Sequence, residues 1–291
     1  MIFQSGLMSD WLNLKSLVDL MISGSDIEWL DFAKSLAASA GEIMIEARSK
    51  AAFVRDYKGD HELVTTTDLA IDQFLCSSIA MRYPEHLILS EESSPALQFT
   101  SSDTPVWVID PIDGTVNFAH GHAHVAVSIG LYLNGERIIG VVNAPFLNEC
   151  YWARKSHGAY CNNELLSVSG NSLLRNALVA TGFPYQKDAL KPILERVSRI
   201  LHACQDVRRN GSAALDLCWV AAGRLDAYFE TVKPWDMAAG ALIAEEAGAK
   251  VGRYSVPQND WPEAINGDSL LVSSPALFDD LYALLQPEYS L

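Results

Sequence analysis

The segment that most restricts the fold is the alternating run "VAVSIGLYLNGERIIGVV" at residues 125–142. Apolar residues recur at alternate positions around Asn134-Gly135, a dipeptide that favours the type I′ turn of a two-residue hairpin. The run therefore predicts two antiparallel strands. A second hairpin is expected within residues 150–163, where His157-Gly158 and Asn162-Asn163 supply turn residues.

Helical spacing governs the chain before these hairpins. Apolar residues recur three or four positions apart over residues 26–48, and Ser25 with Glu28 has the spacing of a capping box, so a long helix is expected there. Residues 1–25 are expected to be an N-terminal extension. Its short apolar helix should end at Ser23-Gly24-Ser25, because serine and glycine commonly punctuate helices.

A second helix is expected over residues 68–82. Thr67 has the side chain of an N-cap, and Pro84 follows the last helical position. This interpretation places Asp68 at a helix start.

The second half of the chain alternates strand and helix patterns. Strands are expected in "NALVATGF" and "RLDAYFE", and helices from about Asp188 to Ala203, from Ser212 and from near Trp235. The predicted fold class is therefore α/β, with an α+β N-terminal half that contains an antiparallel sheet and an α/β C-terminal half. The expected boundary near residue 150 divides a subdomain at 26–150 from one at 151–291, with a cleft between them.

Composition narrows the classes of partner. The formal net charge of −15, from 36 acidic and 21 basic residues, argues against a nucleic-acid-binding surface. Five scattered cysteines without a CxxC motif predict reduced thiols in a cytoplasmic protein. The first 25 residues lack the features of a secretion signal, and no apolar run approaches the ~20 residues of a membrane span, so no membrane association is expected.

The segment "DPIDGTVNFAHGHAH" at residues 110–124 carries two sets of potential metal ligands. In its first half, Pro111 and Gly114 favour a sharp turn after a strand, which can aim Asp110 and Asp113 at one point. Hard oxygen ligands of this kind suit Mg²⁺ or Mn²⁺. A helix beginning after Gly114 would add backbone N–H groups suited to a phosphate oxygen. Alone, the motif also fits a structural loop with an Asx-turn.

Carboxylates elsewhere favour the metal interpretation. Glu91 follows a preceding apolar run, Asp68 lies at a helix start, and "KPWDMAAG" places Asp236 at another helix start. Carboxylates, cations and free amides together predict phosphoryl chemistry.

The second half contains alternating histidines at positions 120, 122 and 124. On a strand, His120, His122 and His124 would share one face, as zinc ligands often do. No further partners for such a site are evident, so these histidines are expected at a turn or at the rim of the cleft. Arg208 and Arg209 fit either a phosphate contact or an interface ion pair.

Taken together, these motifs resemble the inositol monophosphatases, within the Mg²⁺-dependent, lithium-sensitive sugar phosphatase superfamily. The resemblance extends from about residue 26 to the C-terminal part of the chain. It rests on ordered motifs: "LVTTTD" (63–68), "LSEES" (89–93), "WVIDPIDGTVNF" (107–118), "RRNGSAALDL" (208–217) and "KPWDMAAG" (233–240). It implies a layered αβαβα fold and a homodimer.

The resemblance also implies a ligand set for two or three Mg²⁺ ions, for which Mn²⁺ can substitute. Glu91, Asp110 and the Ile112 carbonyl would hold the first ion, and Asp110, Asp113 and Asp236 the second. A third would lie near Glu91 and Asp68. The family mechanism is direct in-line attack by metal-activated water, with Asp68, Glu91 and Thr115 in catalytic roles and no phospho-enzyme.

Substrate contacts follow from the same resemblance. The backbone amides of Gly114 and Thr115 would bind the phosphate, and a further set of residues would line the polyol pocket: Asp113, Gly211, Ser212, Ala213 and Glu230. The spacing from Glu230 to Asp236 is one residue shorter than the family pattern, so Glu230 is equally interpreted as a salt-bridged strand end. Lys58 resembles a lysine near the third ion.

The expected function is hydrolysis of a phosphorylated polyol, with myo-inositol 1-phosphate as the leading substrate. Alternatives within the superfamily are fructose 1,6-bisphosphate, histidinol phosphate, NADP and nucleotide 3′-phosphates. A different class of function, a non-catalytic interaction protein on the same fold, is disfavoured because none of the expected metal ligands is lost.

Overall fold

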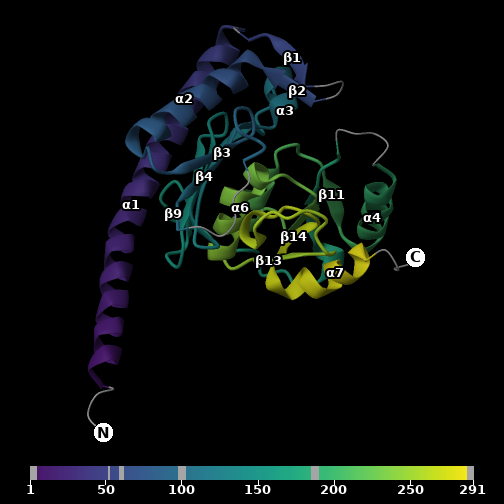
Figure 1. The fold of residues 1–291 in the computed structure, drawn as a ribbon. Coiled ribbons are helices and arrows are strands. Elements are labelled where there is room, and N and C mark those ends of the chain that lie inside the picture. Colours follow the sequence, from purple (N-terminus) through teal and green to yellow (C-terminus); the bar gives the residue numbers. More distant parts are fainter. Residues whose placement is uncertain (1–4, 52, 59–61, 98–102, 185–189, 287–291) are drawn as a thin grey trace.

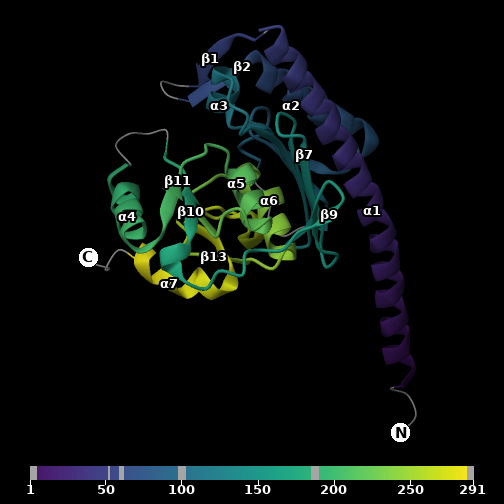
Figure 2. The same ribbon diagram turned by 180° about the vertical axis from the view of Figure 1, so that it is seen from behind.

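The computed structural model describes residues 5–51, 53–58, 62–97, 103–184 and 190–286, and side chains from residue 25 onward. Within this part of the chain, a seven-stranded and a five-stranded sheet alternate with three pairs of helices (Figures 1 and 2). This is the predicted α/β class with five layers. No helix among these residues combines the length and apolar character of a bilayer span.

The seven-stranded sheet runs in the order β3-β4-β5-β6-β7-β8-β9. Its strands are β3 (Leu87–Ser90), β4 (Val106–Asp113), β5 (Ala126–Leu133), β6 (Glu136–Ala144), β7 (Glu149–Arg154), β8 (Ala159–Cys161) and β9 (Glu164–Leu165). Both predicted hairpins are confirmed. Asn134 and Gly135 have φ values of 51° and 84°, as a type I′ turn requires.

The five-stranded sheet has the order β11-β10-β12-β14-β13. Its strands are β10 (Leu178–Thr181), β11 (Asp206–Arg208), β12 (Ala227–Glu230), β13 (Lys250–Arg253) and β14 (Leu270–Ser273). The boundary between the two sheets thus falls between Leu165 and Leu178. The predicted division near residue 150 is too early, because the first sheet continues beyond it: β7 pairs with β6, β8 with β7 and β9 with β8.

Alternating side chains distribute the core over three interfaces. In β4, Trp107 and Ile109 pack under α1 (Ser5–Ser49) and α2 (Thr66–Arg82), whereas Val106 and Val108 face the middle layer. The middle layer consists of α5 (Ala213–Ala221) and α6 (Pro234–Glu246). On the far side of the second sheet, Phe229 and Leu271 pack with α4 (Leu190–Ala203) and α7 (Phe278–Leu285).

The longest helix differs from its prediction. α1 is continuous from Ser5 to Ser49, and its N-terminal part extends beyond the body of the molecule (Figure 1). The expected break at Ser23-Gly24-Ser25 and the cap at Ser25 are therefore wrong. Glycine costs only about 1 kcal/mol relative to alanine inside a helix, and none of these three residues removes a backbone donor as proline would.

The cap of the second helix also differs. α2 begins two residues earlier than predicted, and Thr65 rather than Thr67 is its N-cap. Asp68 completes a capping box by accepting a hydrogen bond from the Thr65 backbone N–H at 2.8 Å.

The remaining elements are short. β1 (Arg55–Lys58) and β2 (Glu62–Thr65) form a separate hairpin beside α3 (Thr115–His120), and 3₁₀ turns occur at Leu174–Asn176, Glu263–Ile265 and Pro275–Leu277. The expected start of α4 at Asp188 lies outside the described residues, and the described helix begins at Leu190.

Candidate functional site

A cavity of about 610 Å³ opens where the end of β4 meets the starts of α5 and α6. The lining includes all the residues that the sequence predicted for the site except Asp68: Glu91, Asp110, Ile112, Asp113, Gly114, Thr115, Gly211, Ser212, Ala213, Glu230 and Asp236. The structure thus gathers residues from three widely separated parts of the chain.

A bulge in β4 sets the directions of Asp110 and Asp113. Asp110 pairs with Ser128 and Asp113 with Ala126, so three steps along β4 match two steps along β5. Without the extra residue, side chains three positions apart would point to opposite faces. The bulge brings both carboxylates to the face that meets α6. The Ile112 N–H donates to Asp110 at 3.0 Å, so the expected Asx-type hydrogen bond is also present.

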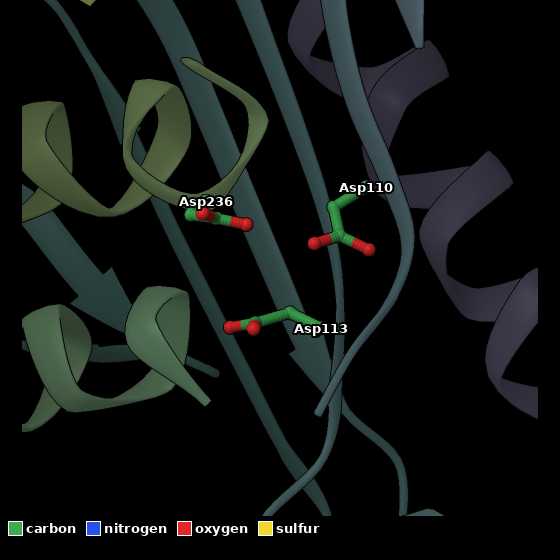
Figure 3. Close-up of side chains that lie close together, drawn as sticks. All are labelled: Asp110, Asp113 and Asp236. Atoms are coloured by element: carbon green, nitrogen blue, oxygen red, sulfur yellow. The ribbon is translucent and has the colours of Figure 1, made fainter. Parts of the chain in front are cut away.

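Asp236 completes an acidic trio. Carboxylate oxygens of Asp110, Asp113 and Asp236 lie within 4.8 Å of one another and turn toward a common space (Figure 3). Asp236 is in the first turn of α6, where its carboxylate accepts from the Lys233 N–H at 2.8 Å. This hydrogen bond orients Asp236 toward β4 and leaves its other oxygen available to a ligand.

Burial raises the pKa of all three carboxyl groups, and their mutual repulsion raises the pKa of Asp110 and of Asp236 further. The pKa of Asp113 rises to about 6, chiefly through burial, although hydrogen bonds from Ser212 and Ala214 oppose the rise. Packing like charges this closely is unfavourable unless a cation lies between them. The donor set consists of hard carboxylate oxygens, which fits a divalent cation of the Mg²⁺ type.

Glu91 extends the acidic group from the neighbouring strand. Its backbone N–H donates to the Ile109 carbonyl at 3.2 Å, immediately beyond β3. Its carboxyl group is close enough to raise the pKa of Asp110 by like charge, second only to burial. Glu91 therefore lies beside Asp110 in the cavity, and its role as a metal ligand stays a prediction.

Gly114 forms the turn between β4 and α3. Its φ is +96°, and it is the N-cap of α3, which confirms that a helix begins after the motif. A Cβ at this position would lie 3.0 Å from the Gly211 carbonyl oxygen and 3.1 Å from that of His124. Glycine is thus required both by backbone conformation and by the close approach of two segments.

Thr115 and Asp68 form a buried pair beside the trio. The Thr115 hydroxyl lies 3.0 Å from Asp68 Oδ1 and 3.1 Å from the Ile112 carbonyl oxygen, and it can donate to one of them at a time. Burial raises the pKa of Asp68, while hydrogen bonds from Thr65 and Thr115 partly oppose the rise. The α2 cap fixes Asp68, although this residue does not line the cavity.

The segment before α5 holds Asp113 from the opposite side. Ser212 Oγ donates to Asp113 Oδ2 at 2.6 Å, and the Ala214 N–H donates to the same oxygen at 2.7 Å. Ser212 is also the N-cap of α5, as predicted, through the Leu215 N–H at 3.3 Å.

Glu230 ends β12 and lies in the cavity. Its carboxylate accepts a hydrogen bond from the Tyr228 hydroxyl, and it forms no ion pair with any residue that the structure describes. The interpretation as a salt-bridged strand end is therefore wrong, despite the short spacing to Asp236. Burial raises the pKa of Glu230 to about 7, against the opposing effects of Tyr228 and Arg209.

The histidines do not share a strand face. His120 is the last residue of α3, Gly121 is the C-cap of that helix, and His122 is exposed. Among the described residues, the acidic trio is the one group of His, Cys, Asp and Glu side chains found with metal-ligand spacing. The strand-face arrangement considered for zinc is thus wrong.

His124 has a structural partner that sequence reasoning missed. Its Nε2 lies 3.0 Å from Asp216 Oδ1, which also accepts from Asn210 Nδ2 at 2.7 Å. Asn117 Nδ2 donates to the carbonyls of Asn210 and His124 at 2.7 and 2.8 Å. This network joins the end of α3 to the segment that carries Ser212. The alternation of histidines obscured it, because residues 121–124 form a turn between α3 and β5 and not a strand.

The remaining candidate residues from the sequence lie in different surroundings. Arg208 forms an ion pair with Asp206 at 2.5 Å, whereas Arg209 lines the cavity. Lys58 is the last residue of β1, and its side chain lies outside the described residues. Cys218, in α5, is fully buried.

The comparison with known proteins agrees with this geometry. A family model described as the inositol monophosphatase family matches residues 26–288. This chain belongs to the inositol monophosphatase family. The family match begins within α1, so residues 5–25 of that helix lie outside it.

Similar proteins carry two kinds of name. The Nus factor SuhB of Vibrio cholerae is 41% identical over 250 residues, covering 84% of this chain and 91% of the relative. Inositol monophosphatase 1 of Sus scrofa is 39% identical over 226 residues, covering 76% and 82%. The solved inositol monophosphatase of Anabaena superposes with a TM-score of 0.75 at 34% identity, covering 89% and 95%.

Proposed function

We propose that this protein is a Mg²⁺-dependent phosphomonoesterase that hydrolyses a polyol monophosphate, with myo-inositol 1-phosphate as the leading substrate. The observation that carries the proposal is the acidic trio of Asp110, Asp113 and Asp236 beside the start of α3. Family membership supports the same reaction class. Fold alone would not, because one fold hosts many functions.

The oxygen donors that line the cavity support two main metal positions and a third nearby. Glu91, Asp110 and the Ile112 carbonyl would hold one ion, and Asp110, Asp113 and Asp236 another, with a third near Glu91 and Asp68. When bound, Mg²⁺ supplies charge neutralisation and Lewis-acid polarisation of phosphate oxygens and water.

Side chains and backbone amides of the protein would orient the substrate and transfer protons. With the Thr115 hydroxyl donating to Asp68 at 3.0 Å, the Thr115 oxygen retains lone pairs that can accept a proton from an attacking water. Its raised pKa makes Asp68 better suited to receive a proton near neutral pH than an exposed aspartate. The backbone N–H groups of Gly114 and Thr115 would bind the phosphate.

The far side of the cavity suits a hydroxylated leaving group. Glu230 accepts hydrogen bonds, and Gly211, Ser212 and Ala213 provide backbone and hydroxyl groups beside it. Fructose 1,6-bisphosphate, histidinol phosphate, NADP and nucleotide 3′-phosphates remain the alternative substrates.

Phosphate release from a panel of these compounds tests the proposal. We expect turnover with Mg²⁺, none with EDTA, and a loss of more than about 10³-fold in Asp110→Asn, since one buried ligand is lost to both metal positions. Asp280→Asn, on the exposed side of α7, is the matched control. Metal-independent turnover, or an active Asp110→Asn, would refute the metal mechanism.

A binding role beside catalysis is a second candidate. The specific observation in its favour is that relatives as similar as the named inositol monophosphatases are called Nus factors. A catalytically inactive Asp110→Asn chain that still complements the loss of this protein in its host would support such a role. Failure to complement would restrict the function to catalysis.

We also propose a homodimer in the cytoplasm. All five cysteines are free thiols, as expected in a reducing compartment. Light scattering of the purified protein tests the dimer, and a monomeric mass would exclude it.

A further inference from the structure

Two adjacent arginines, Arg208 and Arg209, have different surroundings. Arg208 ends β11 and donates to Asp206 at 2.5 Å and to the Val207 carbonyl at 3.0 Å. Arg209 points the other way and lines the cavity. The first arginine is therefore satisfied by its own strand, and the second faces the candidate active site.

Apolar and backbone surfaces hold the Arg209 side chain. Its guanidinium lies over the Phe183 ring, 6.0 Å from the centroid, at the limit of a cation–π contact. Its Nη1 lies 2.5 Å from the place that a Cβ on Gly211 would occupy. Gly211 has a φ of +93°, so this position excludes a side chain for two reasons.

The guanidinium keeps its hydrogen-bonding capacity. Among the residues that the structure describes, no hydrogen bond or ion pair to Arg209 is found, although a guanidinium carries five N–H donors. Glu230 is the carboxylate that feels its charge, yet Glu230 is hydrogen-bonded to the Tyr228 hydroxyl instead. The Arg209 donors thus remain available within the cavity.

The acidic groups of the cavity make this arginine unusual. Among the described residues that line the cavity, Lys233 is the one basic residue besides Arg209, and it belongs to the turn that places Asp236. A planar guanidinium matches the paired oxygens of a phosphate or carboxylate, which a lysine ammonium does not. A neutral polyol offers no such group.

We propose that Arg209 binds a second anionic group of a substrate, so that the site accepts phosphomonoesters that carry another phosphate or a carboxylate beside those with a neutral polyol. The inference rests on the proposed phosphomonoesterase function and specifies its substrate class. The acidic trio and the α3 amides serve the phosphate that is hydrolysed, and Arg209 serves the other anionic end.

The test compares Arg209→Gln with Arg208→Gln on three probes. These are myo-inositol 1-phosphate, with a neutral ring, fructose 1,6-bisphosphate, with a second phosphate, and 6-phosphogluconate, with a carboxylate. We expect Arg209→Gln to lower kcat/KM for one or both of the two-anion probes by about 10- to 100-fold, mainly through KM, since charge-assisted hydrogen bonds are lost. We expect less than about a threefold change for the neutral-ring probe and in Arg208→Gln.

The two-anion probes identify the source of the charge. A selective loss with the bisphosphate assigns a phosphate, and one with 6-phosphogluconate assigns a carboxylate. An equal loss with all three probes would overturn the inference, because Arg209 would then act on the common phosphate. A loss of the same size in Arg208→Gln would overturn it as a general charge effect.

Binding separates this inference from the proposed function. If no probe releases phosphate, the phosphomonoesterase proposal fails, and calorimetric titration of fructose 1,6-bisphosphate with Ca²⁺ in place of Mg²⁺ still tests Arg209. A dissociation constant raised at least about tenfold in Arg209→Gln, and unchanged in Arg208→Gln, supports anion binding. Unchanged affinity in Arg209→Gln, or no binding by the unmodified protein, overturns it.

Discussion

The two halves of the segment 110–124 look equally suited to a metal in the sequence, but the fold surrounds them differently. Asp110 and Asp113 meet a third carboxylate. Burial raises the pKa of both groups, and neighbouring like charges raise the pKa of Asp110 further. His124 meets a complementary partner, Asp216, at 3.0 Å. We call the first half unbalanced, because its buried carboxylates repel one another, which indicates that a cation belongs between them. We call the second half balanced, because its histidine is paired with an aspartate, which indicates a structural role.

Removing a charge from the unbalanced half should have the largest effect. We expect Asp236→Asn to lower phosphatase activity by more than about 10³-fold and to raise the melting temperature in EDTA by about 2–4 °C, because repulsion within the trio falls. Phosphate release and thermal denaturation measure the two effects. An active variant, or one that melts lower in EDTA, would contradict this interpretation of the trio.

Gly114 joins the halves, since a Cβ there would press on both Gly211 and His124. We expect Gly114→Ala to destabilise the protein by about 2 kcal/mol, through the positive φ and the two contacts, and to lower kcat about 100-fold. Urea denaturation and initial rates are the measurements. Gly121→Ala is the control, because it has a similar φ of +81° but open space around its Cβ position. Equal effects of the two variants would assign the cost to backbone strain alone.

The pH dependence of metal-free stability sharpens the comparison. The folded-state pKa of Asp113 is about 6 and exceeds the ordinary value of 3.8, so the folded state binds its proton more tightly than the unfolded state does. Stability in EDTA should therefore rise by about 1–3 kcal/mol as the pH falls from 7.5 to 5, before other groups titrate. Urea denaturation at both pH values measures it. Saturating Mg²⁺ should remove or reverse the trend, and a rise with pH in EDTA would refute uncompensated burial.

A change in the balanced half should have the smallest effect. We expect His124→Gln to cost about 1 kcal/mol of stability and to raise the Mg²⁺ concentration for half-maximal activity about tenfold, because the segment holding Ser212 loses one support. Thermal denaturation and Mg²⁺ titration test it. His122→Gln, at an exposed position, should change neither quantity. If His124→Gln abolished activity outright, the histidine would have to act on the substrate directly.

Local patterns in the sequence predicted most elements of the fold. The Asn134-Gly135 turn and the helix start at Ser212 follow from period and capping rules, whereas the layer order was implied by the family resemblance. The predicted break in α1 is wrong, because a serine-glycine cluster interrupts a helix only weakly when a long helical pattern flanks it. The predicted boundary near residue 150 is wrong, because β7 to β9 extend the edge of the first sheet, and the local sequence does not show which strands will pair.

The candidate site could be predicted where its carboxylates occur in recognisable motifs. Asp110, Asp113 and Asp236 fall together as expected. The place of Glu230 in the cavity could not be predicted securely from its spacing to Asp236. The number of residues between them does not show that the intervening turn can compensate for one residue fewer. The Asp216 and Asn210 contacts of His124 could not be predicted, since they depend on the packing of α5 against the α3 turn.

Because of the β4 bulge, the candidate site depends on the exact number of residues between Asp110 and Asp113. A strand assigns side chains to its faces by odd and even positions, and one extra residue makes an odd separation behave as an even one. Replacing Ile112 by another residue would keep that count, whereas deleting it would turn one carboxylate away from α6. Insertions and deletions between Asp110 and Asp113 should therefore be tolerated far less than substitutions of the residues between them.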